Sequence, residues 1–225
     1  MIYITGDTHG DFKRFSKFNK VHFKRRDFLI VCGDFGFVWD NSAKEWANLK
    51  KFLKLRCCVL FIEGTHDNLG ALSQFPKKEM WGGEVRELTE NLFWLQRGNV
   101  FNIEGKKIFA MGGGQSVDAD ERIKGISWWP EEMPTHEELM AAEENLYRND
   151  YEVDYIISHQ NPHGNSIILD STASKTNPLS TFLSKVSRNV KFDHWYFGGE
   201  HMDKTISSKM TAVFEKIYTI KTDTK

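Results

Sequence analysis

The chain opens with MIYITGDTHGDF over residues 1–12, where a β-prone apolar run ends at a glycine and polar residues follow at once. The run Met1–Thr5 predicts a short buried strand. Asp7 and His9 come directly after it, two positions apart. In an extended chain, side chains at this spacing leave the same face, so both can contact one ion. The opening therefore predicts a strand that carries two potential metal ligands at its carboxyl end.

The same arrangement recurs along the chain, because several apolar runs that predict strands are each followed by a potential ligand. FLIVC at 28–32 and CCVLFI at 57–62 are typical of strands covered on both faces. Segments of helical periodicity lie between these strands and favour a mainly parallel sheet, in which functional groups collect at the carboxyl ends. The residues that follow predicted strands are Asp7, His9, Asp34, His66, Asp67, His159 and His201.

The strongest helix signal covers Thr135–Asn149, where Thr135 and Glu138 have the spacing of a capping box. Residues 115–134 have no clear periodicity and predict an irregular loop. The other predicted elements are helices Phe12–Phe18, Asn41–Leu55 and Leu179–Val186, and strands Leu92–Trp94, Val100–Ile103, Lys107–Met111, Tyr155–Ser158, His194–Phe197, Met210–Phe214 and Lys216–Ile220.

Length and composition predict a single domain over residues 1–225, because no Pro/Gly/Ser-rich linker divides the 225 residues. Hydrophobic residues make up 40% and charged residues 27%, which is typical of a globular protein with an apolar core. The 30 Lys and Arg nearly balance the 31 Asp and Glu. The composition therefore gives no strong nucleic-acid signal and no net attraction to an anionic membrane.

The location expected from the sequence is cytoplasmic. No basic segment followed by a long apolar segment indicates a signal peptide, and no apolar run approaches the roughly 20 residues that span a bilayer. Cys32, Cys57 and Cys58 lie in apolar runs, and an odd count with two adjacent cysteines argues against a disulfide framework. We expect three reduced thiols and no membrane association.

In their order along the chain, these motifs resemble those of the calcineurin-like metallophosphoesterases, above all the small bacterial members. That family carries Asp-x-His, Gly-Asp, Gly-Asn-His-Asp/Glu, a lone His and Gly-His-x-His. The resemblance covers nearly the whole chain and implies an α/β fold, a four-layer α/β/β/α sandwich of two mixed sheets with a metal site along one edge. The counterparts here are Asp7-Thr8-His9, Gly33-Asp34, Gly64-Thr65-His66-Asp67, His159 and Gly198-Gly199-Glu200-His201.

The resemblance also implies a ligand set and a reaction. Asp7, His9, Asp34 and His201 would hold one divalent ion, and Asp34 would bridge to a second ion that His159 also contacts. Metal-activated water would hydrolyse a phosphoester, with Asp34 and His66 as catalytic residues and His66 beside the phosphate. Oxygen and imidazole ligands suit Mn, Fe, Zn or Mg ions.

Two positions depart from the family pattern, because Thr65 replaces an asparagine and Gly199 replaces a histidine. Three alternatives remain open. A substitute ligand can hold the second ion, with Glu200 the best candidate, Thr65 a weak one, and Asp67, Gln160 and His163 weaker still. The protein can instead use one tightly held ion. Thirdly, catalysis can be lost, which would leave a regulatory module or one that binds a phosphate ligand or a partner.

We expect a metal-dependent hydrolase of phosphomonoesters or phosphodiesters rather than an impaired binding module, because His66 serves chemistry in the family and is retained. The substrate would be a phosphorylated small molecule or a nucleotide. Arg122, in the predicted loop 115–134, is a candidate contact for its phosphate. That loop and residues 160–178 are expected to determine specificity.

Overall fold

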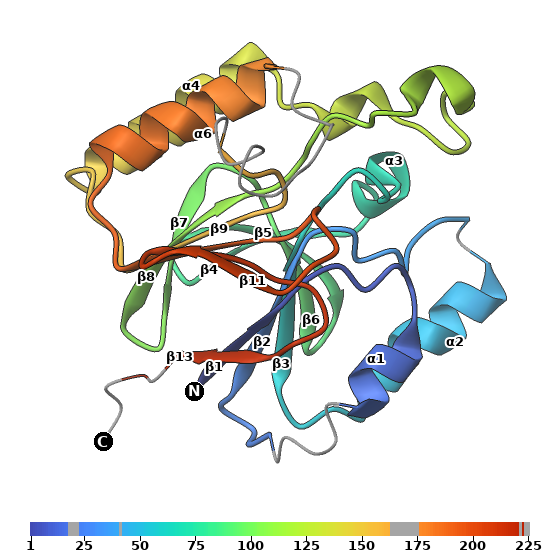
Figure 1. The fold of residues 1–225 in the computed structure, drawn as a ribbon. Helices are drawn as coiled ribbons and strands as arrows, with labels where there is room; N and C mark the ends of the chain where they lie inside the picture. Colours follow the sequence, from blue (N-terminus) through green and yellow to red (C-terminus); the bar gives the residue numbers. More distant parts are fainter. Residues whose placement is uncertain (18–22, 41, 163–175, 221, 223–225) are drawn as a thin grey trace.

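The computed structural model describes residues 1–17, 23–40, 42–162, 176–220 and 222. Two β-sheets form its centre (Figure 1). The seven-stranded sheet runs β13 (Tyr218–Ile220), β1 (Ile2–Thr5), β2 (Phe28–Cys32), β3 (Cys58–Ile62), β6 (Leu92–Leu95), β5 (Gly83–Thr89), β4 (Lys77–Met80). The six-stranded sheet runs β11 (Lys204–Ser207), β12 (Met210–Ala212), β10 (His194–Phe197), β9 (Tyr155–Ser158), β8 (Lys106–Met111), β7 (Asn99–Ile103).

Both sheets are mixed, with a parallel centre and antiparallel edges. Strands β1, β2, β3 and β6 are parallel in the first sheet, and β8, β9, β10 and β12 are parallel in the second. Antiparallel strands β13, β5 and β4 flank the first centre, and β11 and β7 flank the second. The carboxyl ends of the parallel strands therefore gather at one edge of each sheet.

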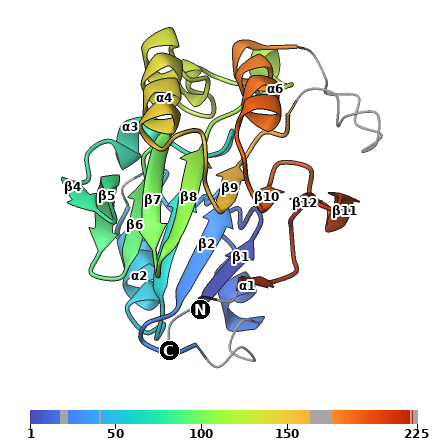
Figure 2. The same cartoon turned by 90° about the vertical axis from the view of Figure 1, so that its left-hand side faces the viewer.

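Helices cover the outer faces of the two sheets. Figures 1 and 2 show α1 and α2 on the side of the first sheet, and α4 and α6 on the side of the second. The chain also forms a short helix, α3, and two 3-10 helices. Their bounds are α1 (Phe12–Lys17), α2 (Ala43–Phe52), α3 (Leu69–Leu72), η2 (Ala119–Glu121), η3 (Pro130–Glu132), α4 (His136–Arg148) and α6 (Pro178–Asn189).

Three clusters of buried hydrophobic residues hold these layers together. One lies between the sheets and joins residues such as Ile30 of β2 to Ile157 of β9. A second packs Phe52 of α2 onto the outer face of the first sheet. The third packs α4 and α6, for example Leu183, onto the outer face of the second sheet. The packing order is helices, sheet, sheet, helices, and the two mixed sheets confirm the expected α/β fold class.

Most predicted elements are present, and the differences have local causes. Helix α2 begins at Ala43 because the Ser42 side chain accepts a hydrogen bond from the Glu45 N–H. The capping box of Thr135 with Glu138 is confirmed. Helix α6 continues three residues beyond the predicted end, to Asn189. Strands β4, β5 and β11 and helix α3 were not predicted. β4 is KKEM and lies exposed at a sheet edge, so its sequence has no apolar pattern.

The three cysteines are free, as expected. Cys32 and Cys57 are buried and Cys58 is half-buried. Within the described residues, no helix combines the length and the apolar character needed to cross a membrane.

A buried ion pair supports the end of β3, close to the strand ends that carry the predicted ligands. The Arg97 Nε atom lies 2.7 Å from Glu63 Oε1, and the two side chains are 7% and 0% exposed. The Trp94 indole N–H donates to Glu63 Oε2 at 2.6 Å. The Glu63 carbonyl accepts the Gly113 N–H at 2.9 Å, which links the end of β3 to the segment after β8.

We expect Arg97→Ala to lower the free energy of unfolding by about 3–5 kcal/mol, because it leaves the buried Glu63 carboxylate without its counter-charge. Urea denaturation of the metal-free protein measures this change. Arg148→Ala is the matched control, since Arg148 pairs with Glu144 at the surface, with side chains 65% and 59% exposed. Its expected cost is about 1 kcal/mol or less. Equal costs for the two variants would contradict the structural role of the buried pair.

Candidate metal centre

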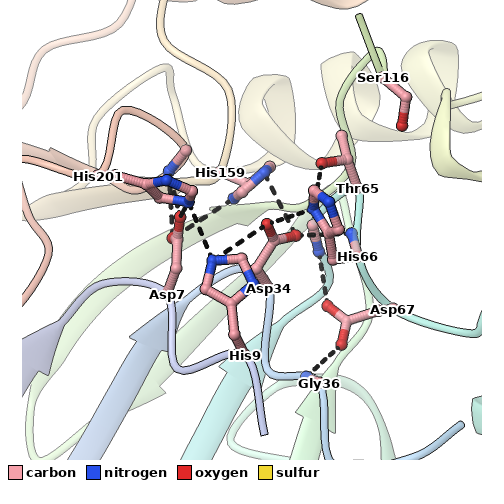
Figure 3. A network of polar contacts seen from close by, with 12 residues as sticks. Asp7, His9, Asp34, Gly36, Thr65, His66, Asp67, Ser116, His159 and His201 are labelled. Atoms are coloured by element: carbon pink, nitrogen blue, oxygen red, sulfur yellow. Dashed lines mark hydrogen bonds and ion pairs between the residues drawn. The ribbon is translucent and has the colours of Figure 1, made fainter. Parts of the chain in front are cut away.

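The predicted ligands lie close together, each after the end of a strand of one of the two sheets (Figure 3). Asp7 follows β1, Asp34 follows β2 and His66 follows β3, all in the first sheet. His159 follows β9 and His201 follows β10, both in the second. The site therefore lies at the junction of the two sheets and takes side chains from each.

Four of these residues form a compact group of potential ligands, namely Asp7, His9, Asp34 and His201, whose ligand atoms all lie within 4.8 Å of one another. His201 Nε2 lies 3.1 Å from Asp7 Oδ2 and 2.9 Å from His9 Nε2. His9 Nε2 lies 3.9 Å from Asp34 Oδ2. The two carboxylates are buried and the two imidazoles are exposed, so a cation can enter from solvent. Two carboxylate oxygens and two imidazole nitrogens fit a divalent ion.

Three of these four residues hold an unusual backbone conformation. The φ angles of His9, Asp34 and His201 are 46°, 43° and 48°, in the left-handed region. This conformation costs roughly 1–2 kcal/mol per residue with a side chain. Such strain persists where the surrounding structure enforces it, and it concentrates at functional sites. The strain is therefore located at the residues that converge on the proposed ion.

Asp34 occupies the centre of the network and is 1% exposed. The His66 backbone N–H donates to its Oδ1 at 2.8 Å, and His66 Nδ1 lies 2.9 Å from its Oδ2. His159 Nε2 lies 3.5 Å from Oδ1. Burial alone would raise the pKa of Asp34, but His159 and the hydrogen bonds from His66 outweigh burial and hold this pKa well below its ordinary value. Asp34 is therefore a carboxylate even before a cation binds.

Burial and the nearby carboxylates act in opposite directions on the pKa values of His159, His201 and His9. Burial lowers the pKa of His159, but the charges of Asp34 and Asp7 outweigh burial and raise it. The hydrogen bond to Asp7 raises the pKa of His201. Burial lowers the pKa of His9. A metal ion must displace protons from imidazoles whose pKa is raised, so acid competes with metal binding.

The two positions that depart from the family pattern lie beside this group. The Thr65 hydroxyl is 3.2 Å from His66 Nδ1. The Gly199 N–H points at the Asp7 carboxylate, 3.1 Å from each oxygen. Glu200 accepts a hydrogen bond from Asn161, and burial raises the pKa of its carboxyl group. Over the described parts of the chain, one group of three or more potential ligands is found, and neither His159 nor Glu200 belongs to it.

The weaker candidates have other partners or lie outside the described residues. The Asp67 carboxylate is buried and accepts backbone N–H groups of Phe35, Gly36 and Gly64, so it joins the loops after β2 and β3. Burial and the Asp34 charge raise its pKa to about 7. The Gln160 side chain exchanges two hydrogen bonds with that of Asn177. His163 lies outside the described residues.

Arg122 reaches the site from the loop before η3. Its Nη2 atom contacts His66 Nε2, and its Nε donates to Asp118 Oδ2 at 2.8 Å. Sequence reasoning missed Asp118 as the residue that anchors this arginine. The spacing of four between opposite charges was the available signal.

The comparison with known protein families agrees with this geometry. The family model described as calcineurin-like phosphoesterase matches residues 1–203. The match includes all four residues of the metal-ligand group. No curated protein gives a significant match to the chain.

Replacing His9 tests both the ligand group and its strained backbone. His9→Gly and His9→Ala each remove one ligand, so both variants should bind Mn²⁺ more weakly than wild type in calorimetric titration. In EDTA, the glycine variant should be more stable than the alanine variant by about 1 kcal/mol, because glycine tolerates a φ of 46°. Glycine normally destabilises a loop relative to alanine. An alanine variant at least as stable as the glycine variant would contradict the strain.

Proposed function

Because the chain belongs to the calcineurin-like phosphoesterase family, we propose that it hydrolyses a phosphomonoester or a phosphodiester with the help of a bound divalent metal ion. The observation that carries this proposal is the group of Asp7, His9, Asp34 and His201 around one point. When bound, the metal ion would activate a water molecule and offset charge on the phosphoryl oxygens.

The residues of the chain have distinct parts in this proposal. Asp7 and Asp34 supply buried negative charge, and His9 and His201 supply neutral nitrogen donors at the exposed side. The Asp34 carboxylate also orients His66 by accepting from its ring and its backbone N–H. The His66 side chain is 41% exposed, and its other ring nitrogen, Nε2, contacts Arg122 Nη2. We propose that His66 stabilises charge on a leaving oxygen, or exchanges a proton with it where the substrate replaces Arg122 at Nε2.

The rival function is an impaired family member that binds a phosphate ligand or a partner. The complete ligand group and the position of His66 on Asp34 favour the hydrolase, because a binding module needs neither. The proposed substrate is a phosphorylated small molecule or a nucleotide, the proposed location is the cytoplasm, and manganese is the first metal to test.

The test uses metal-stripped protein reloaded with Mn²⁺ and assayed on an aryl phosphomonoester and an aryl phosphodiester. Asp34→Asn should lower kcat/KM by roughly 100-fold or more, since even residues that support metal ligands contribute 10–100-fold. The ratio of the two wild-type activities assigns the mono- or diester preference. Equal inactivity of wild type and Asp34→Asn, with metal demonstrably bound to wild type, would favour the binding module.

A further inference from the structure

The place where the family pattern puts the second ion offers poor donors in this chain. The Thr65 hydroxyl faces His66, and its methyl Cγ2 faces Gly114, where an added Cβ would lie 2.8 Å away. Gly199 has a φ of +74°, and a Cβ there would approach the His159 carbonyl oxygen to 3.0 Å. A side chain at 199 would therefore be strained and pressed against His159. Among the described residues, one group of three or more His, Cys, Asp or Glu side chains is placed to hold an ion.

The positively charged guanidinium of Arg122 lies against the turn that contains Thr65 and His66. The Arg122 side chain is 13% exposed, and its guanidinium spans the Thr65–His66 segment. Nη2 contacts His66 Nε2, while Nη1 lies 3.4 Å from the Thr65 carbonyl and 3.5 Å from that of Ser127. These two Nη1 contacts are long, so Nη1 keeps hydrogen-bonding capacity for another acceptor. The guanidinium is thus fixed by Asp118 through Nε, and through Nη2 it contacts His66, whose ring lies against the Asp34 carboxylate.

The charge balance of the site favours a further cation when a substrate binds. One divalent ion neutralises Asp7 and Asp34, so a phosphoryl group adds one or two uncompensated negative charges. The guanidinium is always protonated, and its planar fork matches two phosphate oxygens. Its anchor Asp118 is 41% exposed and bonds only to Nε, so it offsets part of the positive charge and leaves Nη1 and Nη2 to other acceptors.

We propose that this chain works with one divalent ion and that the Arg122 guanidinium replaces the second ion as the partner of the phosphoryl oxygens. Arg122 also holds His66, because an arginine can only donate, and His66 Nε2 must then accept. His66 is left with its proton on Nδ1, which donates to Asp34. The inference rests on the proposed function for its substrate class, but it concerns binding, which can be measured without turnover.

The experiment combines metal analysis with titration of inorganic phosphate. Wild type dialysed against Mn²⁺ should retain one ion per chain by elemental analysis. Arg122→Gln should retain the same metal content and bind phosphate roughly 10- to 100-fold more weakly, as expected for the loss of charge-assisted hydrogen bonds. Arg122→Lys keeps the positive charge but loses the planar guanidinium, so its phosphate affinity should lie between those of wild type and Arg122→Gln. Melting temperatures check that the variants are folded.

Lys124→Gln is the matched control, because Lys124 is exposed on the same loop and the variant loses the same charge. It should bind phosphate as wild type does. Two tightly held ions per chain, unchanged phosphate affinity in Arg122→Gln, or equal losses in Arg122→Gln and Lys124→Gln would each overturn the inference. Hydrolysis by wild type together with any of these results would leave the proposed function standing. If the wild type is inactive but its phosphate binding depends on Arg122, the proposed hydrolysis is refuted and the role of Arg122 in phosphate binding is supported.

Discussion

Asp34 carries a negative charge where water is almost excluded, and much of the surrounding structure compensates for that charge. Its oxygens contact His66 from the loop after β3 and His159 from the end of β9 in the other sheet. Gly64 has no side chain, and a Cβ there would lie 2.1 Å from Asp34 Oδ1. A buried carboxylate is tolerated only with such partners. The same carboxylate therefore joins the two sheets and prepares the place for a cation.

The group of potential metal ligands could be predicted because each member follows a local pattern. Asp7, Asp34 and His201 come after apolar runs that do form parallel strands, and parallel strands place their carboxyl ends together. The contacts of Arg97 and Arg122 could not be predicted in this way. Arg122 meets His66 across 56 positions, through a loop that has no periodicity. Edge strands β4 and β11 are largely exposed, so neither burial nor alternation marks them in the sequence.

The two halves of the site differ in the ligand groups that they offer, as they differ in how closely they follow the family motifs. On one side, two carboxylates and two imidazoles converge on a point that suits a divalent ion. On the other side, Thr65 and Gly199 contribute a hydroxyl and a backbone N–H, and the Arg122 guanidinium lies 3.4 Å from the Thr65 carbonyl. Asp67 supports both sides, because its carboxylate fixes the loops after β2 and β3. The Asp67 carboxylate and the Arg122 guanidinium thus hold the loop of Thr65 and His66, which a second ion would otherwise help to position.

The convergence of ligands from both sheets also sets an order of events in time. His9 and His201 are 192 positions apart in the chain, yet their ring nitrogens lie 2.9 Å from each other. Domains emerge from the ribosome with the amino-terminal part first. A nascent chain that has completed the first strands of the seven-stranded sheet already carries three of the four ligands, and it lacks the fourth until the segment after β10 is made. Metal capture by all four potential ligands would therefore come late in folding rather than at its beginning.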